Sequence, residues 1–157
     1  MSKARASFSN ARLAAVQALY QMELSGASAD AVLEDLRDGR LPAGEAGPLD
    51  GEIDIELFRK IVGAAVEHQG PIDTGVARAL SEGWRLERID AVARAILRAG
   101  AVELMAPGGA PAAVVISEYV DIAKAFFDGP EPGFVNAALD SCARANAARV
   151  AGGGDGG

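Results

Sequence analysis

Apolar residues recur at helical spacing along almost the whole chain. Leu13, Val16, Tyr20 and Leu24 are separated by three or four positions, which predicts a helix over about residues 10–25. The same periodicity predicts further helices over about residues 29–38, 53–66, 71–83, 89–104, 111–126 and 134–142. Because no segment shows the period-two alternation of a strand, we expect an all-α fold of about seven helices.

Glycine and proline mark the segments between the predicted helices. Residues 39–51 contain four glycines and two prolines, and we expect a surface loop there. A linker between domains is the alternative, but the segment before it is too small to bury a core of its own. Residues 1–9 are expected to form a flexible basic arm and the Gly-rich residues 151–157 a disordered tail. The sequence thus predicts one domain over residues 1–150.

The charge is distributed unevenly. The 157 residues carry a formal net charge of −7, which argues against a protein that coats nucleic acid through bulk electrostatics. Residues 1–22 contain three bases and no acid, whereas residues 23–67 contain four bases and eleven acids. Residues 68–157 contain eight bases and eleven acids. A local cationic surface is therefore compatible with the acidic composition.

The composition points to a cytoplasmic protein with no membrane segment, metal or cofactor. The longest apolar run is too short to span a membrane, and no apolar stretch follows the basic N-terminus as in a secretory signal. The single cysteine, Cys142, and the single histidine, His68, can form neither an internal disulfide nor a zinc site. We interpret Cys142 as a core residue and His68 as an exposed residue at a helix end.

Residues that could perform catalysis are sparse. The chain has no phosphate-binding loop, no dinucleotide fingerprint and no evident nucleophile–histidine pair. Glu118 and Asp121 lie three positions apart on one predicted helix, but without histidine partners we interpret them as a solvated face. We therefore expect a binding protein and not an enzyme.

Basic residues are the better candidates for a function. Those that we single out are Lys3, Arg5, Arg12, Arg94 and Arg98. Arg94 and Arg98 are four positions apart and lie roughly 200° around the fifth helix from its apolar stripe, so they are expected to face solvent. The guanidinium fork suits phosphate oxygens. The alternative is an ordinary solvated face, on which the arginines are neutralised by Glu87, Asp90 and Glu103.

Three segments, in order, resemble one known family. Residues 11–20, ARLAAVQALY, are similar to the opening helix of the transcription antitermination factor family NusB. Residues 84–104 begin with WRLERIDAVARAILRA, end in VEL and resemble that family's central helix. Residues 110–126 and 133–140, the second of which reads GFVNAALD, resemble its closing pair of helices. The resemblance covers residues 11 to about 142 and is weakest between 26 and 52.

The resemblance implies a fold, a role and a set of contact residues. The fold is two packed three-helix bundles with a seventh helix. The role is binding of the boxA segment of nascent RNA together with the ribosomal protein NusE, in a complex that joins RNA polymerase during antitermination, without catalysis. Besides Lys3 and Arg5 of the arm, the implied RNA contacts are Arg12, Gln17, Tyr20, Arg94, Arg98 and Phe134. Tyr20 and Phe134 can equally be core residues, and Gln17 can simply be a capping or a solvated residue.

The sequence also departs from the family pattern. Ser7, Phe8, Ser9 and Asn10 stand where a run of arginines often precedes the first helix, and Gly133 replaces a frequent basic residue. Fewer fixed cations predict weaker RNA binding with a shallower salt dependence. Two alternatives stay open. One is a helical protein-interaction domain with little RNA binding, with a homodimer also possible, and the other is an RNA-binding domain related to rRNA cytosine methyltransferases. The chain length argues against the second.

Overall fold

The computed structural model describes residues 3–39, 52–80, 84–106 and 108–155. These residues form seven α-helices and one short 3₁₀ helix, η1 (Leu86–Arg88). The α-helices are α1 (Lys3–Ser25), α2 (Ala29–Arg37), α3 (Ile55–Glu67), α4 (Gln69–Ala79), α5 (Ala91–Met105), α6 (Ala112–Phe126) and α7 (Glu131–Asp155). No strand occurs in this part of the chain, so the predicted all-α fold is confirmed. The predicted loop over 39–51 lies outside the described residues except for Gly39.

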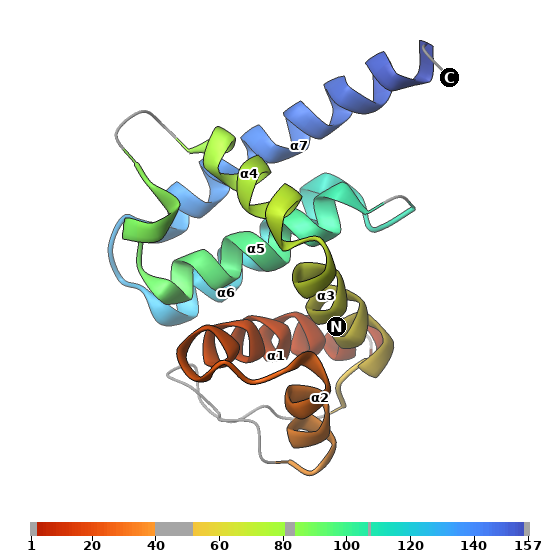
Figure 1. The fold of residues 1–157 in the computed structure, drawn as a ribbon, viewed down its shortest axis with the longest axis vertical. Coiled ribbons are helices and arrows are strands. Elements are labelled where there is room, and N and C mark those ends of the chain that lie inside the picture. The colour runs from red at the N-terminus through yellow and green to blue at the C-terminus, as the bar shows by residue number, and fades with distance from the viewer. Residues whose placement is uncertain (1–2, 40–51, 81–83, 107, 156–157) are drawn as a thin grey trace.

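The helices form two groups that share a central helix (Figure 1). Helices α1, α2 and α3 contact one another, and α4, α5, α6 and α7 form the second group. Helix α5 contacts α1 and α3 of the first group as well as α4, α6 and α7 of its own. The C-terminal part of α7 extends away from the body of the molecule (Figure 1). No helix in the described ranges is long and apolar enough to cross a membrane.

Short polar side chains fix where several helices begin. Ser28 Oγ accepts a hydrogen bond from the Ala31 amide at 3.1 Å before α2, and Asp54 Oδ1 accepts one from the Leu57 amide at 2.8 Å before α3. Asp90 caps α5 in the same way. Each cap satisfies a backbone N–H that has no partner within its helix. These boundaries are therefore defined locally, by residue types that the sequence shows.

Helix α5 is buried around most of its circumference, which periodicity did not predict. Ten of its residues are buried, from Ala93 to Leu104, and small side chains predominate among them. Val92, expected on the buried stripe, is only partly buried, whereas Glu103, expected on a solvated face, is 7% exposed. The reason is that α5 is packed by helices of both groups, so a single apolar stripe does not describe it.

Both ends of the chain are more helical than predicted. The predicted arm, residues 1–9, is already part of α1 from Lys3 onwards, because tertiary contacts hold its first turns. The Asp54 amide donates to the Ser7 carbonyl at 3.1 Å, and Asn10 Nδ2 donates to the Glu52 carbonyl at 3.0 Å. At the other end, α7 continues to Asp155 where we expected disorder from residue 151. Its alanine-rich preceding turns favour this extension of the helix.

The close approach of α5 and α7 requires glycine at position 100. A Cβ atom there would lie 2.9 Å from both Cδ atoms of Leu139, a side chain that is fully buried. We expect Gly100→Ala to lower the free energy of unfolding by about 1–2 kcal/mol, since overpacking costs about 1–3 kcal/mol and improved helix propensity returns up to about 1. Urea denaturation of the purified variant measures this change.

The matched control is Gly63→Ala in α3, where an added Cβ meets no atom within 4 Å. This variant should be more stable than the wild type by about 0.5–1 kcal/mol through helix propensity alone. Equal effects of the two substitutions would contradict the packing argument.

Candidate nucleic-acid interface

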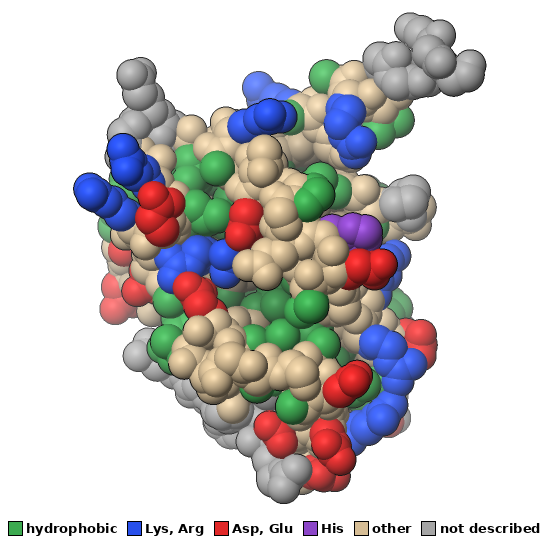
Figure 2. Space-filling model, in the orientation of Figure 1, with side chains coloured by type: hydrophobic (Ala, Val, Ile, Leu, Met, Phe, Trp, Pro, Cys, Tyr) green, Lys and Arg blue, Asp and Glu red, His purple; other side chains and the backbone are tan. Residues whose placement is uncertain are grey.

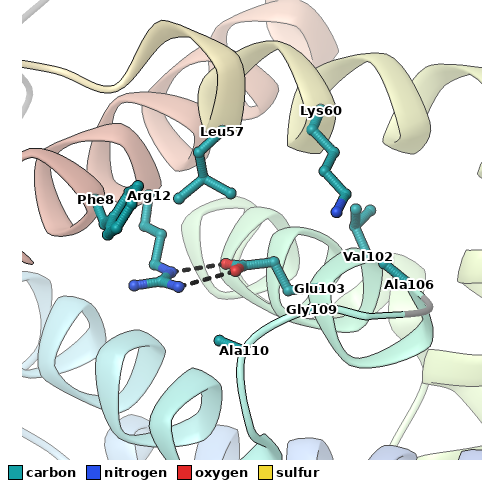
Figure 3. A pocket seen from close by; sticks show the side chains of 9 residues that line it. All are labelled: Phe8, Arg12, Leu57, Lys60, Val102, Glu103, Ala106, Gly109 and Ala110. Carbon is teal, nitrogen blue, oxygen red and sulfur yellow. Dashed lines mark hydrogen bonds and ion pairs between the residues drawn. The ribbon is translucent and has the colours of Figure 1, made fainter.

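Arg12, the first of the predicted RNA contacts, lies in the core between α1 and α5. It is 5% exposed, and its Nε and Nη2 donate to the two carboxylate oxygens of Glu103 at 2.8 and 3.0 Å (Figure 3). Its Nη1 donates to Glu118 Oε1 at 3.1 Å. The Tyr119 hydroxyl donates to Glu103 Oε2 at 2.6 Å, and Ser9 Oγ donates to Glu118 Oε1 at 2.9 Å. We call these five residues the buried Arg12 network.

The network keeps Arg12 in its charged form. Burial alone would lower the pKa of the Arg12 guanidinium, but the hydrogen bonds and negative charge of Glu103 raise it overall. The pKa of Tyr119 is raised well above its ordinary value by its complete burial and by the adjacent Glu103 carboxylate. Arg12 is thus a charged residue whose donors are engaged inside the protein. An RNA phosphate would reach it only in exchange for these bonds.

A small hollow borders the network (Figure 3). It has a volume of about 280 Å³, and its lining is largely apolar, with Phe8 and Leu57 facing Val102 across it. Lys60 is the remaining charged residue of the lining, besides the Arg12–Glu103 pair.

Arg94 and Arg98 lie side by side, as their spacing predicted. The expectation that they face solvent is wrong, because carboxylates from α1 and α4 cover them and leave their side chains only 11% and 18% exposed. Arg98 Nε and Nη2 donate to the Asp73 carboxylate at 2.8 and 2.9 Å, and Arg98 Nη1 contacts Glu23 Oε2 at 3.4 Å. Glu23 also accepts two hydrogen bonds from Arg94. The alternative interpretation, in which Glu87, Asp90 and Glu103 neutralise these arginines, is therefore wrong about the partners, which are Glu23 and Asp73. We call Glu23, Asp73, Arg94 and Arg98 the arginine–carboxylate cluster.

The cluster is electrically balanced and partly open to solvent. Its two arginines and two carboxylates carry no net charge, and the arginine side chains are 11% and 18% exposed. A hollow of about 270 Å³ lies between them and Leu86 and Glu87. The hydrogen bond from Arg98 to Asp73 raises the pKa of Arg98, against the opposing effect of burial. An anion could bind here by displacing carboxylates that already occupy the guanidinium groups.

The remaining predicted residues divide between core and surface. Gln17 is 6% exposed, which excludes the expectation that it is simply solvated, and Tyr20 is half-buried against the core. Arg5 is exposed on the first turns of α1, and the side chain of Lys3 is not described. Arg5 and Glu23 are 18 residues apart on α1, roughly 27 Å at 1.5 Å per residue. The structure therefore does not bring Arg5 beside Arg94 and Arg98.

Phe134 lies on the first turns of α7 and is half-buried, packed against the core. Its ring contacts that of Trp84, with ring centres 4.8 Å apart and an angle of 36° between the planes. Trp84 is 55% exposed and was missed as a site residue. The signal in the sequence was a lone tryptophan followed by arginines at 85 and 88.

The candidate catalytic and metal-binding residues have structural surroundings. Cys142 is buried, and burial raises the pKa of its thiol, whereas His68 is exposed at the junction of α3 and α4. Both were predicted so. Glu118, expected on a solvated face, instead belongs to the buried Arg12 network. No group of three potential metal ligands is found within the described ranges.

Comparisons with known proteins agree on one family. The sequence model described as NusB family matches residues 9–144. A relative named transcription antitermination protein NusB from Caulobacter vibrioides is 52% identical over 134 residues, covering 85% of this chain and 90% of that protein. A protein of the same name from Maricaulis maris is 49% identical over 134 residues, covering 85% of this chain and 84% of that protein.

Solved structures give the same result. The chain is similar to the structure titled T. maritima NusB, with a TM-score of 0.69, 28% identity and 92% coverage of both chains. It is also similar to a chain of a structure titled antitermination factors NusB and NusE in complex with dsRNA. The TM-score is 0.73 and the identity 26%, with 92% of this chain and 99% of that chain covered.

The buried Arg12 network should be essential for stability. We expect Arg12→Ala to lower the free energy of unfolding by about 3–5 kcal/mol, because Glu103 is then left as a buried charge without its partner. Chemical denaturation followed by far-ultraviolet circular dichroism measures the change.

Arg59→Ala serves as the control. Arg59 pairs with Glu56 at 3.7 Å on the exposed surface of α3, so its loss should change stability by less than about 0.5 kcal/mol. A stable Arg12→Ala protein that has lost only RNA binding would show instead that Arg12 is a phosphate contact.

Proposed function

The chain belongs to the NusB family, and from this we propose that it is a transcription antitermination factor that binds boxA RNA of nascent ribosomal transcripts. It does so together with the ribosomal protein NusE, in the cytoplasm, and acts on RNA polymerase as part of the assembled complex. The observation that carries the proposal is the 52% identity to a named antitermination protein over 134 residues. The fold shared with a chain from a NusB–NusE–RNA structure supports the two partners. The function is binding, with no chemical step.

The RNA surface that the geometry favours lies around the arginine–carboxylate cluster. The side chains of Arg94 and Arg98 keep a small part of their surface open to solvent, at 11% and 18% exposure, and Tyr20 lies one helical turn before Glu23 on α1. Arg94 Nη1 also donates to the carbonyls of Leu86 and Ile89, both at 2.9 Å, which links the cluster to the segment that carries Trp84. The cluster thus combines two arginines of α5 with aromatic residues on α1 and on the segment before α5. Unpaired RNA is recognised by this combination of groups.

Binding at the cluster is an exchange of anions. Glu23 and Asp73 hold the guanidinium groups in the free protein, so RNA phosphates must replace carboxylates and do not meet vacant cations. The net gain per contact is therefore smaller than for a free arginine. This weak intrinsic affinity fits a protein that acts together with a second RNA-binding subunit, since linked contacts increase the overall affinity without new bonds in either subunit.

Fluorescence anisotropy with boxA RNA and a scrambled control, with and without NusE, tests the function. We expect preferential binding of boxA RNA that strengthens in the presence of NusE and weakens as salt rises. The proposal would be contradicted if both RNAs bound equally weakly, if added salt abolished this binding, and if no complex with NusE were detectable. That outcome would favour a protein-interaction domain.

Substitutions in the cluster test which surface binds. Arg98→Ala should weaken boxA binding and lower the slope of log K against log salt by roughly 0.7 for each phosphate that is no longer neutralised. Glu23→Gln, which frees both arginines from one carboxylate, should tighten binding about fivefold, the factor that corresponds to roughly 1 kcal/mol.

Arg144→Ala is the matched control, because Arg144 is exposed and paired only with Asp140 on the same helix among the described residues. It should bind boxA RNA like the wild type. If Glu23→Gln weakened binding as much as Arg98→Ala, the cluster would act as a structural element and not as the RNA surface.

A further inference from the structure

Trp84 is exposed although it is the largest apolar side chain and the single tryptophan of the protein. Its exposed fraction is 55%, whereas most large apolar residues that the structure describes are buried. Its indole ring is packed against Phe134, at 4.8 Å between ring centres and an angle of 36°. This tilted pair lies within the range of ring separations that aromatic pairs prefer. Trp84 thus rests on one ring and keeps much of its surface open to solvent.

The surroundings hold this aromatic pair in place. Phe134 is half-buried against the core, and its amide donates to the Pro130 carbonyl at 3.1 Å in the first turn of α7. On the other side, Arg94 bonds the carbonyls of Leu86 and Ile89 and so fixes the segment that follows Trp84. The pair is therefore a preorganised surface, and little ordering would be needed when a ligand binds.

Two exposed cations lie within four positions after Trp84. Arg85 and Arg88 are both exposed, and neither forms an ion pair with any residue of the described ranges. Of the nearby acids, Glu87 is exposed, and the Asp90 carboxylate caps α5 by accepting from the Val92 amide at 2.8 Å. In Figure 2, Lys and Arg side chains stand at the left edge of the molecule, where Figure 1 places the segment before α5.

We propose that Trp84, supported by Phe134, is a stacking platform for an unpaired base of the bound RNA, with Arg85 and Arg88 contacting the adjacent phosphates. The inference rests on the proposed RNA-binding function and adds a base-contacting residue to it. Aromatic rings bind bases by stacking irrespective of sequence, because every base presents a π-face. Such a platform would supply affinity that the N-terminal segment without its arginine run does not provide.

The neighbouring charges favour RNA over a protein partner. An exposed tryptophan is also typical of protein-binding hot spots, but these lie in apolar patches from which water is excluded on binding. Burying Arg85 and Arg88 in such a patch would leave two charges without partners, at a large energetic cost. A polyanion pairs these charges while its bases stack on the ring.

Intrinsic fluorescence tests the platform directly, because all tryptophan emission comes from Trp84. We expect boxA RNA to quench this emission, with the same saturation curve that anisotropy of labelled RNA gives. Trp84→Ala should weaken boxA binding about 5- to 150-fold, the range of one base–aromatic stack. Trp84→Phe, which keeps an aromatic face, should restore most of the affinity.

Control variants separate the platform from general effects. Val66→Ala removes another exposed apolar side chain, on α3, and should bind RNA like the wild type. Arg85→Ala combined with Arg88→Ala should reduce the salt slope by roughly 0.7 for each phosphate that the two arginines neutralise in the wild type. Arg78→Ala, which removes an exposed cation on α4, should leave the slope unchanged. Circular dichroism of each variant confirms that it is folded.

The outcomes distinguish this inference from the function on which it rests. Binding of boxA RNA with unchanged emission, and wild-type affinity of Trp84→Ala, would overturn the platform and leave the RNA-binding function intact. Loss of affinity that Trp84→Phe does not restore would show a structural role and also overturn it. A third outcome is that NusE alone changes the emission and that Trp84→Ala no longer binds NusE. This would overturn the platform, because the ring would then belong to a protein interface. Absence of any boxA preference would overturn both proposals.

Discussion

The fold depends on one buried ion pair between its first and its central helix. Arg12 and Glu103 are 5% and 7% exposed, and two parallel hydrogen bonds join them. Burial removes both charges from bulk water, so each residue is stable in the core only because the other is present. The Tyr119 hydroxyl donates a further hydrogen bond to Glu103, and Glu118 accepts one from Arg12. Since Glu103 lies on α5, which contacts both groups of helices, the pair fixes how the two groups are joined.

The helices could be predicted from the sequence, but the surroundings of α5 could not. The spacing of Leu13, Val16 and Tyr20 is a local signal, and such periodicity identified the helices correctly. The caps that the structure shows at Ser28 and Asp54 are local as well. Burial on several sides depends on helices far away in sequence, and periodicity along one helix does not contain that information. For this reason periodicity did not predict that Val92 is only partly buried and that Glu103 is buried.

The candidate site was predictable in part for the same reason. The four-residue spacing of Arg94 and Arg98 placed them together, as the structure shows, but Glu23 and Asp73 are 71 and 25 residues away from their partners. Arg12 looked like the other cations in the sequence, and only the three-dimensional contacts with Glu103 distinguish it. Trp84 carried no periodic signal, because it lies in the connection before α5 and contacts Phe134 across 50 positions.

The shared central helix also determines how the molecule unfolds. Because α5 contacts α1 and α3 on one side and α4, α6 and α7 on the other, neither group can separate without exposing the apolar residues of α5. The two groups are therefore expected to unfold as one cooperative unit, with the amides of α5 exchanging last. A ligand that binds one group then protects the other as well, so that binding energy gained at the surface is distributed over the whole domain.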